Sequence, residues 1–239
     1  MENDQADSIG RPQYRKINTA LELFTHSAVS LDYKNIMQQF NLSDIESWEK
    51  IYRANFINSL TGFKSANLIG TINGDGQTNV AMFSSIVHIG SNPALIGFIN
   101  RPRTSTTHTL SNIESTGVYT INQIHPSFLE AAHQTSAKYP VDQSEFDITG
   151  LTPQFIAGIE APFVEESRVK IGLRLAEIIP IKLNDTFLVI GRVIFVMMED
   201  QILGEDGFLA LDQSGTIASN GNDTYYSTQV IRKFPYARP

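Results

Sequence analysis

A tight turn at Asn73-Gly74-Asp75-Gly76 constrains the fold more than any other feature, because it separates two apolar runs at residues 66–72 and 77–89. Asn, Asp and Gly tolerate the positive φ angles that a short hairpin loop requires. The pattern therefore predicts a β-hairpin whose second strand covers residues 77–89. Since a hairpin makes its two strands antiparallel, the chain is expected to build an antiparallel sheet.

The chain between residues 90 and 198 repeats this arrangement of strands and turns. Apolar residues occupy every second position from Val169 to Leu175, which is the period of a strand with one face toward solvent. Short turns are expected at residues 90–93 and at Asn184-Asp185. Further strands are expected at residues 94–100, 118–122 and 187–198. Because strands outnumber helices, we expect a mainly β fold, an antiparallel barrel with peripheral helices.

The helices are fewer and lie between the strands. Ser43 and Glu46 have the spacing of a capping box, so a helix is expected to begin at Ser43 and to continue to Leu60, with Gly62 after its end. A second helix is expected at residues 107–116, closed by Gly117, and a helical turn near residues 128–132.

The remaining organisation is simple. Residues 1–42 lack clear periodicity, and we interpret them as an N-terminal arm. No internal repeat or linker divides residues 43–239, which are therefore expected to form one domain.

Composition excludes several classes of function. The absence of cysteine removes disulfides, thiolate metal sites, iron–sulfur clusters and cysteine nucleophiles. A formal net charge of −7 disfavours binding to the phosphate backbone, so no nucleic-acid partner is expected. The histidines lack metal-ligand spacing, so no metal site is predicted. The longest apolar stretch, residues 187–198, is too short to cross a bilayer, and we expect a cytoplasmic protein without a membrane partner.

Residues 101–109, with the sequence RPRTSTTHT, carry the clearest chemical signal. Two arginines, one histidine and five hydroxyl side chains lie at the start of an expected helix. A helix N-terminus offers unpaired amides and the positive end of its dipole, and arginine binds phosphate through two parallel hydrogen bonds. We predict a phosphate cradle, the alternative being an ordinary helix cap in a polar loop. The candidate ligands are Arg101, Arg103, Thr107, His108 and Thr109.

A second signal is the pair Ser84-Ser85 at the end of an apolar run. Paired hydroxyls at a strand end can hydrogen-bond a flat heterocycle. The alternative is the solvated face of an edge strand. No Walker A, GxGxxG or GxSxG motif is present, and we assign no catalytic side chain.

At these same residues the sequence resembles the flavin reductase-like family, the FMN-binding split-barrel proteins that include flavoredoxin. The resemblance covers about residues 54–200. Its matching stretches are NVAMFSSIVHIGS at 79–91, residues 93–98 and 101–102, residues 108–109, 112–113 and 116–122, HQTSA at 133–137, residues 144–146 and 150–152, residues 161–162 to 166–167, and residues 191–196.

The resemblance implies a split β-barrel, a homodimer, FMN bound near the dimer interface, and reduction by NADH or NADPH. Carried over by position, it implies that Asn79, Ser84 and Ser85 lie along the flavin ring and ribityl chain. It places Arg101, His108 and Thr109 at the phosphate. The stretch that contains Gln134 and Ser136 is expected to approach the cofactor.

Three functions remain open from the sequence. The first is an NAD(P)H-dependent flavin reductase, an FMN oxidoreductase that could supply reduced flavin to a separate monooxygenase. The second is a non-enzymatic FMN-binding electron carrier that a partner protein reduces. The third is a barrel that binds another phosphorylated heterocycle. In the first two, the cofactor carries the reactivity, which explains why no acid–base dyad is evident.

Overall fold

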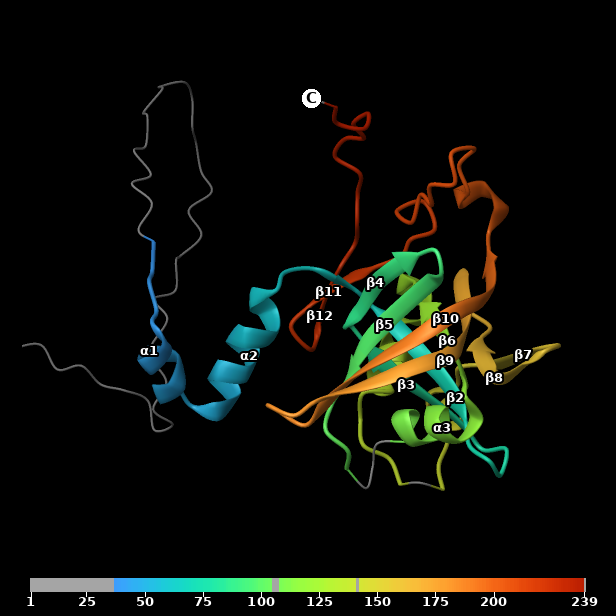
Figure 1. The fold of residues 1–239 in the computed structure, drawn as a ribbon, viewed down its shortest axis with the longest axis horizontal. Helices are drawn as coiled ribbons and strands as arrows, with labels where there is room; N and C mark the ends of the chain where they lie inside the picture. Colours follow the sequence, from blue (N-terminus) through green and yellow to red (C-terminus); the bar gives the residue numbers. More distant parts are fainter. Residues whose placement is uncertain (1–36, 105–107, 141, 239) are drawn as a thin grey trace, which may run out of the picture. The chain divides into compact units, whose positions relative to one another are not determined.

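The computed structural model describes residues 37–104, 108–140 and 142–238, and its main element is a seven-stranded antiparallel sheet (Figure 1). The mainly β class with peripheral helices is confirmed. Across the sheet the strands follow the order β3 (Thr78–Phe83), β2 (Asn67–Ile72), β6 (Val118–Gln123), β9 (Val169–Ile181), β10 (Thr186–Met198), β5 (Ala94–Asn100) and β4 (Ile86–Ser91).

The chain has several smaller elements besides this sheet. One small sheet pairs β1 (Lys64–Ser65), β11 (Ala218–Asn220) and β12 (Thr224–Tyr226), and another pairs β7 (Pro153–Ile156) with β8 (Ile159–Val164). The helices are α1 (Leu42–Ser47), α2 (Lys50–Leu60), α3 (Thr109–Thr116), α4 (Leu129–Gln134) and α5 (Glu145–Thr149), with 3₁₀ turns η1 (Pro126–Phe128) and η2 (Asp200–Ile202). By its contacts the chain divides into residues 1–44 and residues 45–239.

The hairpin predicted at residues 73–76 is confirmed between β2 and β3. The side-chain oxygen of Asn73 accepts hydrogen bonds from the backbone amides of Asp75 and Gln77, at 3.0 and 2.8 Å. Gly76 has a φ of +87°, which explains why glycine stands there. This turn fixes the register that places Gly70 opposite Val80.

The single strand predicted for residues 77–89 is wrong, because the chain changes partners inside it. β3 ends at Phe83 and pairs with β2, whereas β4 begins at Ile86 and pairs with β5. These two strands form opposite edges of the sheet, yet only two residues separate them. Three Cα–Cα steps span at most about 11 Å, so the sheet must curl until its edges lie side by side. The expected barrel follows from this connection.

The helix expected from Ser43 to Leu60 is also wrong in its boundaries, since it is two helices. The side-chain oxygen of Asn41 accepts from the amide of Asp44 at 3.1 Å, and the Asp44 carboxylate accepts from the amide of Asn41 at 2.8 Å. The capping box is therefore Asn41–Asp44 and not Ser43–Glu46. The Glu49 carboxylate accepts from the amides that begin α2, which starts a second helix.

The other helical predictions fare better. α3 ends at Gly117 as predicted, with a φ of +71° at that glycine. The helical turn expected near residues 128–132 is longer, since η1 and α4 together run from Pro126 to Gln134.

The strand that begins at Val169 was predicted to have one face toward solvent. This prediction is wrong for the first residues of the strand. Lys170 is buried, and its ammonium group donates hydrogen bonds to the side-chain oxygen of Gln154 and to the backbone carbonyl of Glu165. Gly172 is buried as well, beneath Ile159 of β8. The β7–β8 hairpin thus covers a face that the alternation alone assigns to water.

The barrel interior holds the main apolar core. It joins side chains of β2, β5, β6, β9 and β10 to two residues of α3, Leu110 and Ile113. Because these two side chains are buried in the barrel, the N-terminus of α3 has a fixed position. Tyr119 of β6 is fully buried in the same core, and its hydroxyl has no hydrogen-bond partner among the described residues.

Gly191 of β10 makes room for this tyrosine. A Cβ atom at Gly191 would lie 2.2 Å from the Tyr119 hydroxyl oxygen, so Gly191→Ala is expected to destabilise the fold by about 1–3 kcal/mol. Tyr119→Phe removes a buried hydroxyl that has no hydrogen-bond partner among the described residues. The unfolding free energy of this variant should therefore equal or exceed that of the natural protein. The double variant should recover part of the Gly191→Ala loss, because it removes the clashing atom. Urea unfolding of the four proteins measures this, and strictly additive losses would contradict the proposed contact.

Candidate functional site

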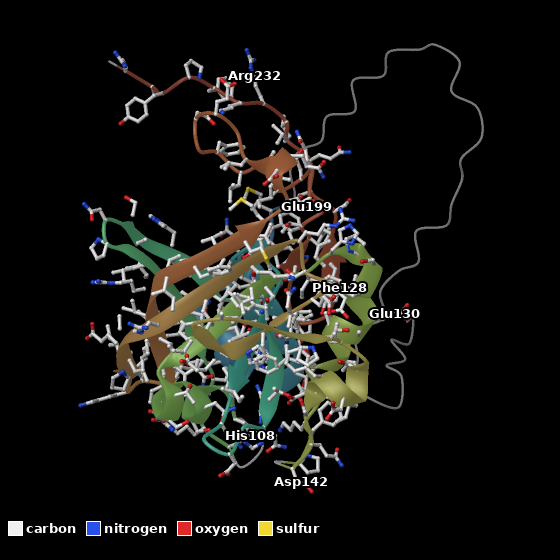
Figure 2. All side chains as sticks on the ribbon, turned by 90° about the vertical axis from the view of Figure 1, so that its right-hand side faces the viewer. His108, Phe128, Glu130, Asp142, Glu199 and Arg232 are labelled. Carbon is white, nitrogen blue, oxygen red and sulfur yellow. The ribbon has the colours of Figure 1, made fainter. Side chains whose placement is uncertain are left out.

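A small polar pocket lies where the β2–β3 turn, the start of β3 and the N-terminus of α3 meet. The loop that precedes α5 closes its remaining side. Figure 2 shows His108 at this end of the molecule, on the same side as Asp142. The described residues that line the pocket are Asn73, Gln77, Thr78, Asn79, His108, Asn112 and Gln143.

His108 is the outstanding residue of this pocket. It occupies the N-cap position of α3, but its side chain makes no capping hydrogen bond. Its Nε2 atom is buried and has no hydrogen-bond partner among the described residues. A buried polar atom without a partner is costly, so a native structure normally supplies one, here from a molecule that enters the pocket.

Buried hydrogen bonds hold the frame around His108 in place. The amide group of Asn79 donates to the hydroxyl of Thr109 at 3.4 Å, which ties β3 to the first residue of α3. The amide group of Asn112 donates to the hydroxyl of Thr71 at 3.1 Å, which ties the next turn of the helix to β2. The pocket is therefore preorganised by two strands and one helix.

Three of the residues predicted from the sequence thus come together, namely Asn79, His108 and Thr109. Asn112 was missed, although it follows His108 by four residues and so shares its helix face. Sequence reasoning also missed the residues of the hairpin turn and of the loop before α5, which the fold alone brings to the pocket: Asn73, Gln77, Thr78 and Gln143.

The two arginines of the predicted cradle have partners elsewhere. Arg103 makes a two-bond ion pair with Glu114 of α3, with an Nη1–Oε2 distance of 2.8 Å, and lies over the ring of Phe187. Hydrogen bonding to Arg103 lowers the pKa of the Glu114 carboxyl, and the same contact raises the pKa of Arg103. Arg101 donates to the side-chain oxygen of Asn222 at 3.0 Å. Thr107 lies outside the described residues.

The paired serines differ from each other. The hydroxyl of Ser85 donates to the carbonyl of Ile99 at 3.0 Å and accepts from the amide of the same residue at 3.1 Å. The Ser85 hydroxyl therefore replaces the backbone of a neighbouring strand as hydrogen-bond partner of Ile99, at the point where the chain passes from one edge of the sheet to the other. Ser84 is half-buried and makes no side-chain hydrogen bond with the described residues, so its hydroxyl is available to a ligand.

Gln134 and Ser136 lie on another part of the molecule, at the end of α4 and just after it. Both are exposed, and the amide of Gln134 donates to the hydroxyl of Tyr139 at 2.7 Å. Gln134 lines a separate open groove and not the polar pocket.

Comparisons with known proteins identify this architecture. The model of the flavin reductase like domain matches residues 62–217, well over half of the chain. The chain belongs to the flavin reductase-like family. The predicted split β-barrel is confirmed by a candidate flavin reductase with a split barrel domain from Shewanella frigidimarina NCIMB 400. That protein is 46% identical, with a TM-score of 0.81 over 84% of this chain and 100% of the other.

Two more distant structures share the family fold. Nitrilotriacetate monooxygenase component B from Bacillus cereus has a TM-score of 0.73 at 20% identity, over 84% of this chain and 100% of that protein. Flavoredoxin of Desulfovibrio vulgaris (Miyazaki F) has a TM-score of 0.63 at 20% identity, over 73% and 92%. At these identities the likeness concerns the fold.

Two further observations apply to the part of the chain that the structure describes. It contains no cluster of three or more His, Asp or Glu side chains that could hold a metal ion. None of its helices has the length and apolar character that crossing a membrane requires.

In this flavin reductase-like barrel, a buried carboxylate outside the pocket lining ties α5 to β3. One carboxylate oxygen of Glu145 accepts from the backbone amide of Val80 at 3.2 Å, on the free side of edge strand β3. The hydroxyls of Thr78 and Ser144 form a second link at 2.8 Å. Burial raises the pKa of Glu145, and the backbone hydrogen bonds that it accepts oppose this only in part.

Glu145→Gln tests this arrangement through the pH dependence of stability. A carboxyl whose pKa is raised by folding binds its proton more tightly in the folded state. Its contribution is therefore fully present below its unfolded pKa of about 4.5 and is lost as the pH rises through the folded pKa. Glutamine keeps an oxygen for the Val80 amide but cannot ionise. The variant should match the wild type near pH 4 and equal or exceed its unfolding free energy at pH 7, as measured by urea unfolding. A clear loss at pH 7 would show that the charged form stabilises the fold.

Proposed function

We propose that the protein is an FMN-binding, NAD(P)H-dependent flavin reductase that acts as a homodimer in the cytoplasm. Membership of the flavin reductase-like family supports the flavin and the oxidoreductase class. The observation that carries the assignment is the polar pocket at the start of α3, where the Nε2 atom of His108 has no hydrogen-bond partner in the part of the chain that the structure describes.

The residues present fit a phosphate-bearing flavin. A protonated Nε2 of His108 would donate to a phosphate oxygen or a ribityl hydroxyl. The positive end of the α3 dipole favours an anion at the same place, and the described lining residues include no carboxylate. The side chains of Thr78, Asn79 and Asn112 add neutral polar groups. Arg101 and Arg103 would have to leave Asn222 and Glu114 to join them.

The protein's own contribution to the reaction is to bind and orient. When bound, the flavin would supply the hydride-transfer chemistry, so none of the chain's own side chains has to react. The chain holds the phosphate end at α3 and excludes water from the ring. Ser84, whose hydroxyl is free of described partners, is the better of the two serines to contact the ring, since Ser85 is engaged by Ile99.

One further candidate function has support of its own. Flavoredoxin shares the fold, and the pocket would hold FMN equally well in an electron carrier that a partner protein reduces.

The similarity to a monooxygenase component B supports the proposal that reduced flavin is passed to a separate monooxygenase. A barrel for another phosphorylated heterocycle remains the third hypothesis, and flavin titration decides on it.

His108→Ala should weaken FMN binding selectively. A hydrogen bond to a charged phosphate is worth about 1.5–3 kcal/mol, which is roughly a tenfold to hundredfold change in Kd. Riboflavin lacks the phosphate, so its affinity should change much less. Fluorescence quenching of both flavins measures the two affinities, with His88→Ala, an exposed histidine on β4, as the matched control. Equal losses for FMN and riboflavin would remove His108 from the phosphate site.

Rapid mixing of the FMN-loaded protein with NADH or NADPH tests the enzyme itself. We expect the flavin absorbance to bleach with at least one nucleotide, faster than free FMN does under the same conditions. The two nucleotides in parallel also establish which one is preferred. Bleaching by neither nucleotide, in a protein that binds FMN, would favour the electron carrier.

A further inference from the structure

The segment Phe234–Arg238 exposes large aromatic side chains to solvent, which is unusual for residues of this type. Phe234 is 69% exposed and Tyr236 is 90% exposed, although both are large aromatic side chains. Aromatic residues and arginine are the types that most often dominate protein interfaces. We call residues 234–238 the hook.

The residues just before the hook make contacts on the surface. The ammonium group of Lys233 bonds the carboxylate of Asp206 at 2.6 Å and lies 4.7 Å from the ring centre of Phe208. The guanidinium of Arg232 lies 4.7 Å from the ring centre of Phe234. Figure 2 shows Arg232 far from the side of the molecule that carries Phe128 and Glu130.

The sequence of the hook favours an extended shape. Pro235 restricts Phe234 to extended backbone, and none of residues 234–238 belongs to a helix or strand. In an extended chain, side chains two residues apart point to the same side, so Phe234, Tyr236 and Arg238 share one face. Because Pro235 restricts the backbone around it, the segment loses less conformational entropy when it binds in an extended shape.

A surface of matching chemistry lies around α4. An open groove of about 750 Å³, which we call the acidic groove, contains two carboxylates and no lysine or arginine among its described lining residues. Its apolar side chains come from η1, α4 and the end of α5. Phe128 and Leu151 are buried, so the apolar surface that a partner could reach comes from Leu129 and Ile148, beside Glu130 and Glu166.

The two carboxylates of the groove are not equivalent. Both oxygens of Glu166 lie within hydrogen-bond distance of the backbone amide of Thr152, at 3.0 and 3.3 Å. Glu130 is exposed and has no hydrogen bond or ion pair with the described residues. It is therefore the carboxylate that is free to meet an incoming cation. The hook supplies one in Arg238 and carries no acidic residue.

We propose that the hook of one copy of this chain binds in the acidic groove of a second copy. Phe234 and Tyr236 lie against Leu129 and Ile148, and Arg238 pairs with Glu130. Two-fold symmetry lets each copy give a hook and receive one, which closes the assembly at two chains. The inference rests on the homodimer of the proposed function but is separate from flavin binding.

Cysteine cross-linking tests the exchange directly, because the natural chain contains no cysteine. Ala237→Cys in the hook and Ala131→Cys in the groove are made in separate, differently tagged full-length chains and mixed under mild oxidation. We expect a disulfide between the two tags. Leu183→Cys, an equally exposed residue on the β9–β10 turn, replaces Ala237→Cys as the control and should give none. If both cysteines in one chain link only within that chain, the second copy is not the occupant.

Analytical ultracentrifugation of full-length variants measures the Kd of the dimer. Phe234→Ser with Tyr236→Ser should raise the dimer Kd by about tenfold or more, whereas Leu183→Ser should leave it unchanged. Arg238→Glu and Glu130→Arg should each weaken the dimer, and together they should restore it. A dimer of unchanged Kd in all variants, without the cross-link, overturns the hook but leaves the homodimer standing. A wild-type monomer at micromolar concentration overturns both.

Discussion

The two-residue link Ser84-Ser85 is the constraint on which the rest of the structure depends. It joins β3 and β4, which form opposite edges of the seven-stranded sheet, so the sheet has to close on itself. At this link the hydroxyl of Ser85 forms hydrogen bonds with both the amide and the carbonyl of Ile99. A side chain thus replaces the backbone hydrogen bonds of a strand where the chain passes from one edge of the sheet to the other. Closure creates the interior that receives Leu110 and Ile113, and these residues fix the start of α3. The position of His108 thus follows from the way in which the barrel closes.

Local chemistry explains what could be predicted from the sequence. The hairpin at Asn73–Gly76, strand β5 and the end of α3 at Gly117 depend on turn residues and on periodicity within a few positions. His108 and Thr109 were predicted from the polar residues at the start of an expected helix, whereas Asn79 was implied only by the family resemblance, which placed it along the flavin ring and ribityl chain. Prediction failed where distant segments decide. Lys170 is buried because a separate hairpin covers it, and the change of partner inside residues 77–89 cannot be read from apolar spacing.

The arginines illustrate the same limit in electrostatic terms. Arg103 and Glu114 are separated by eleven positions, and Arg101 meets Asn222 across 121 positions. Neither contact follows from composition, yet both determine how much positive charge reaches the pocket. With Arg103 neutralised by Glu114, attraction for an anion comes mainly from the α3 dipole and from His108, each of which is effective only over a short range. A site of this kind selects for a group that fits against the helix end rather than for negative charge in general.

Hydrogen bonds of one side chain join elements of the polar pocket and of the acidic groove to the segment that leads to the hook. Tyr225 of β12 lies a few residues before the hook, and its hydroxyl bonds the ring nitrogen Nδ1 of His133 on α4 at 2.7 Å. The same hydroxyl lies 3.0 Å from the sulfur of Met82 on β3, the strand that carries Asn79 into the pocket. One side chain therefore connects the segment that leads to the hook with the helix that lines the acidic groove and with a strand that contributes to the polar pocket. The contact with Met82 is partly buried, whereas the contact with His133 is exposed. The groove that we assign to a second copy and the pocket that we assign to the flavin share this support, although no described residue lines both.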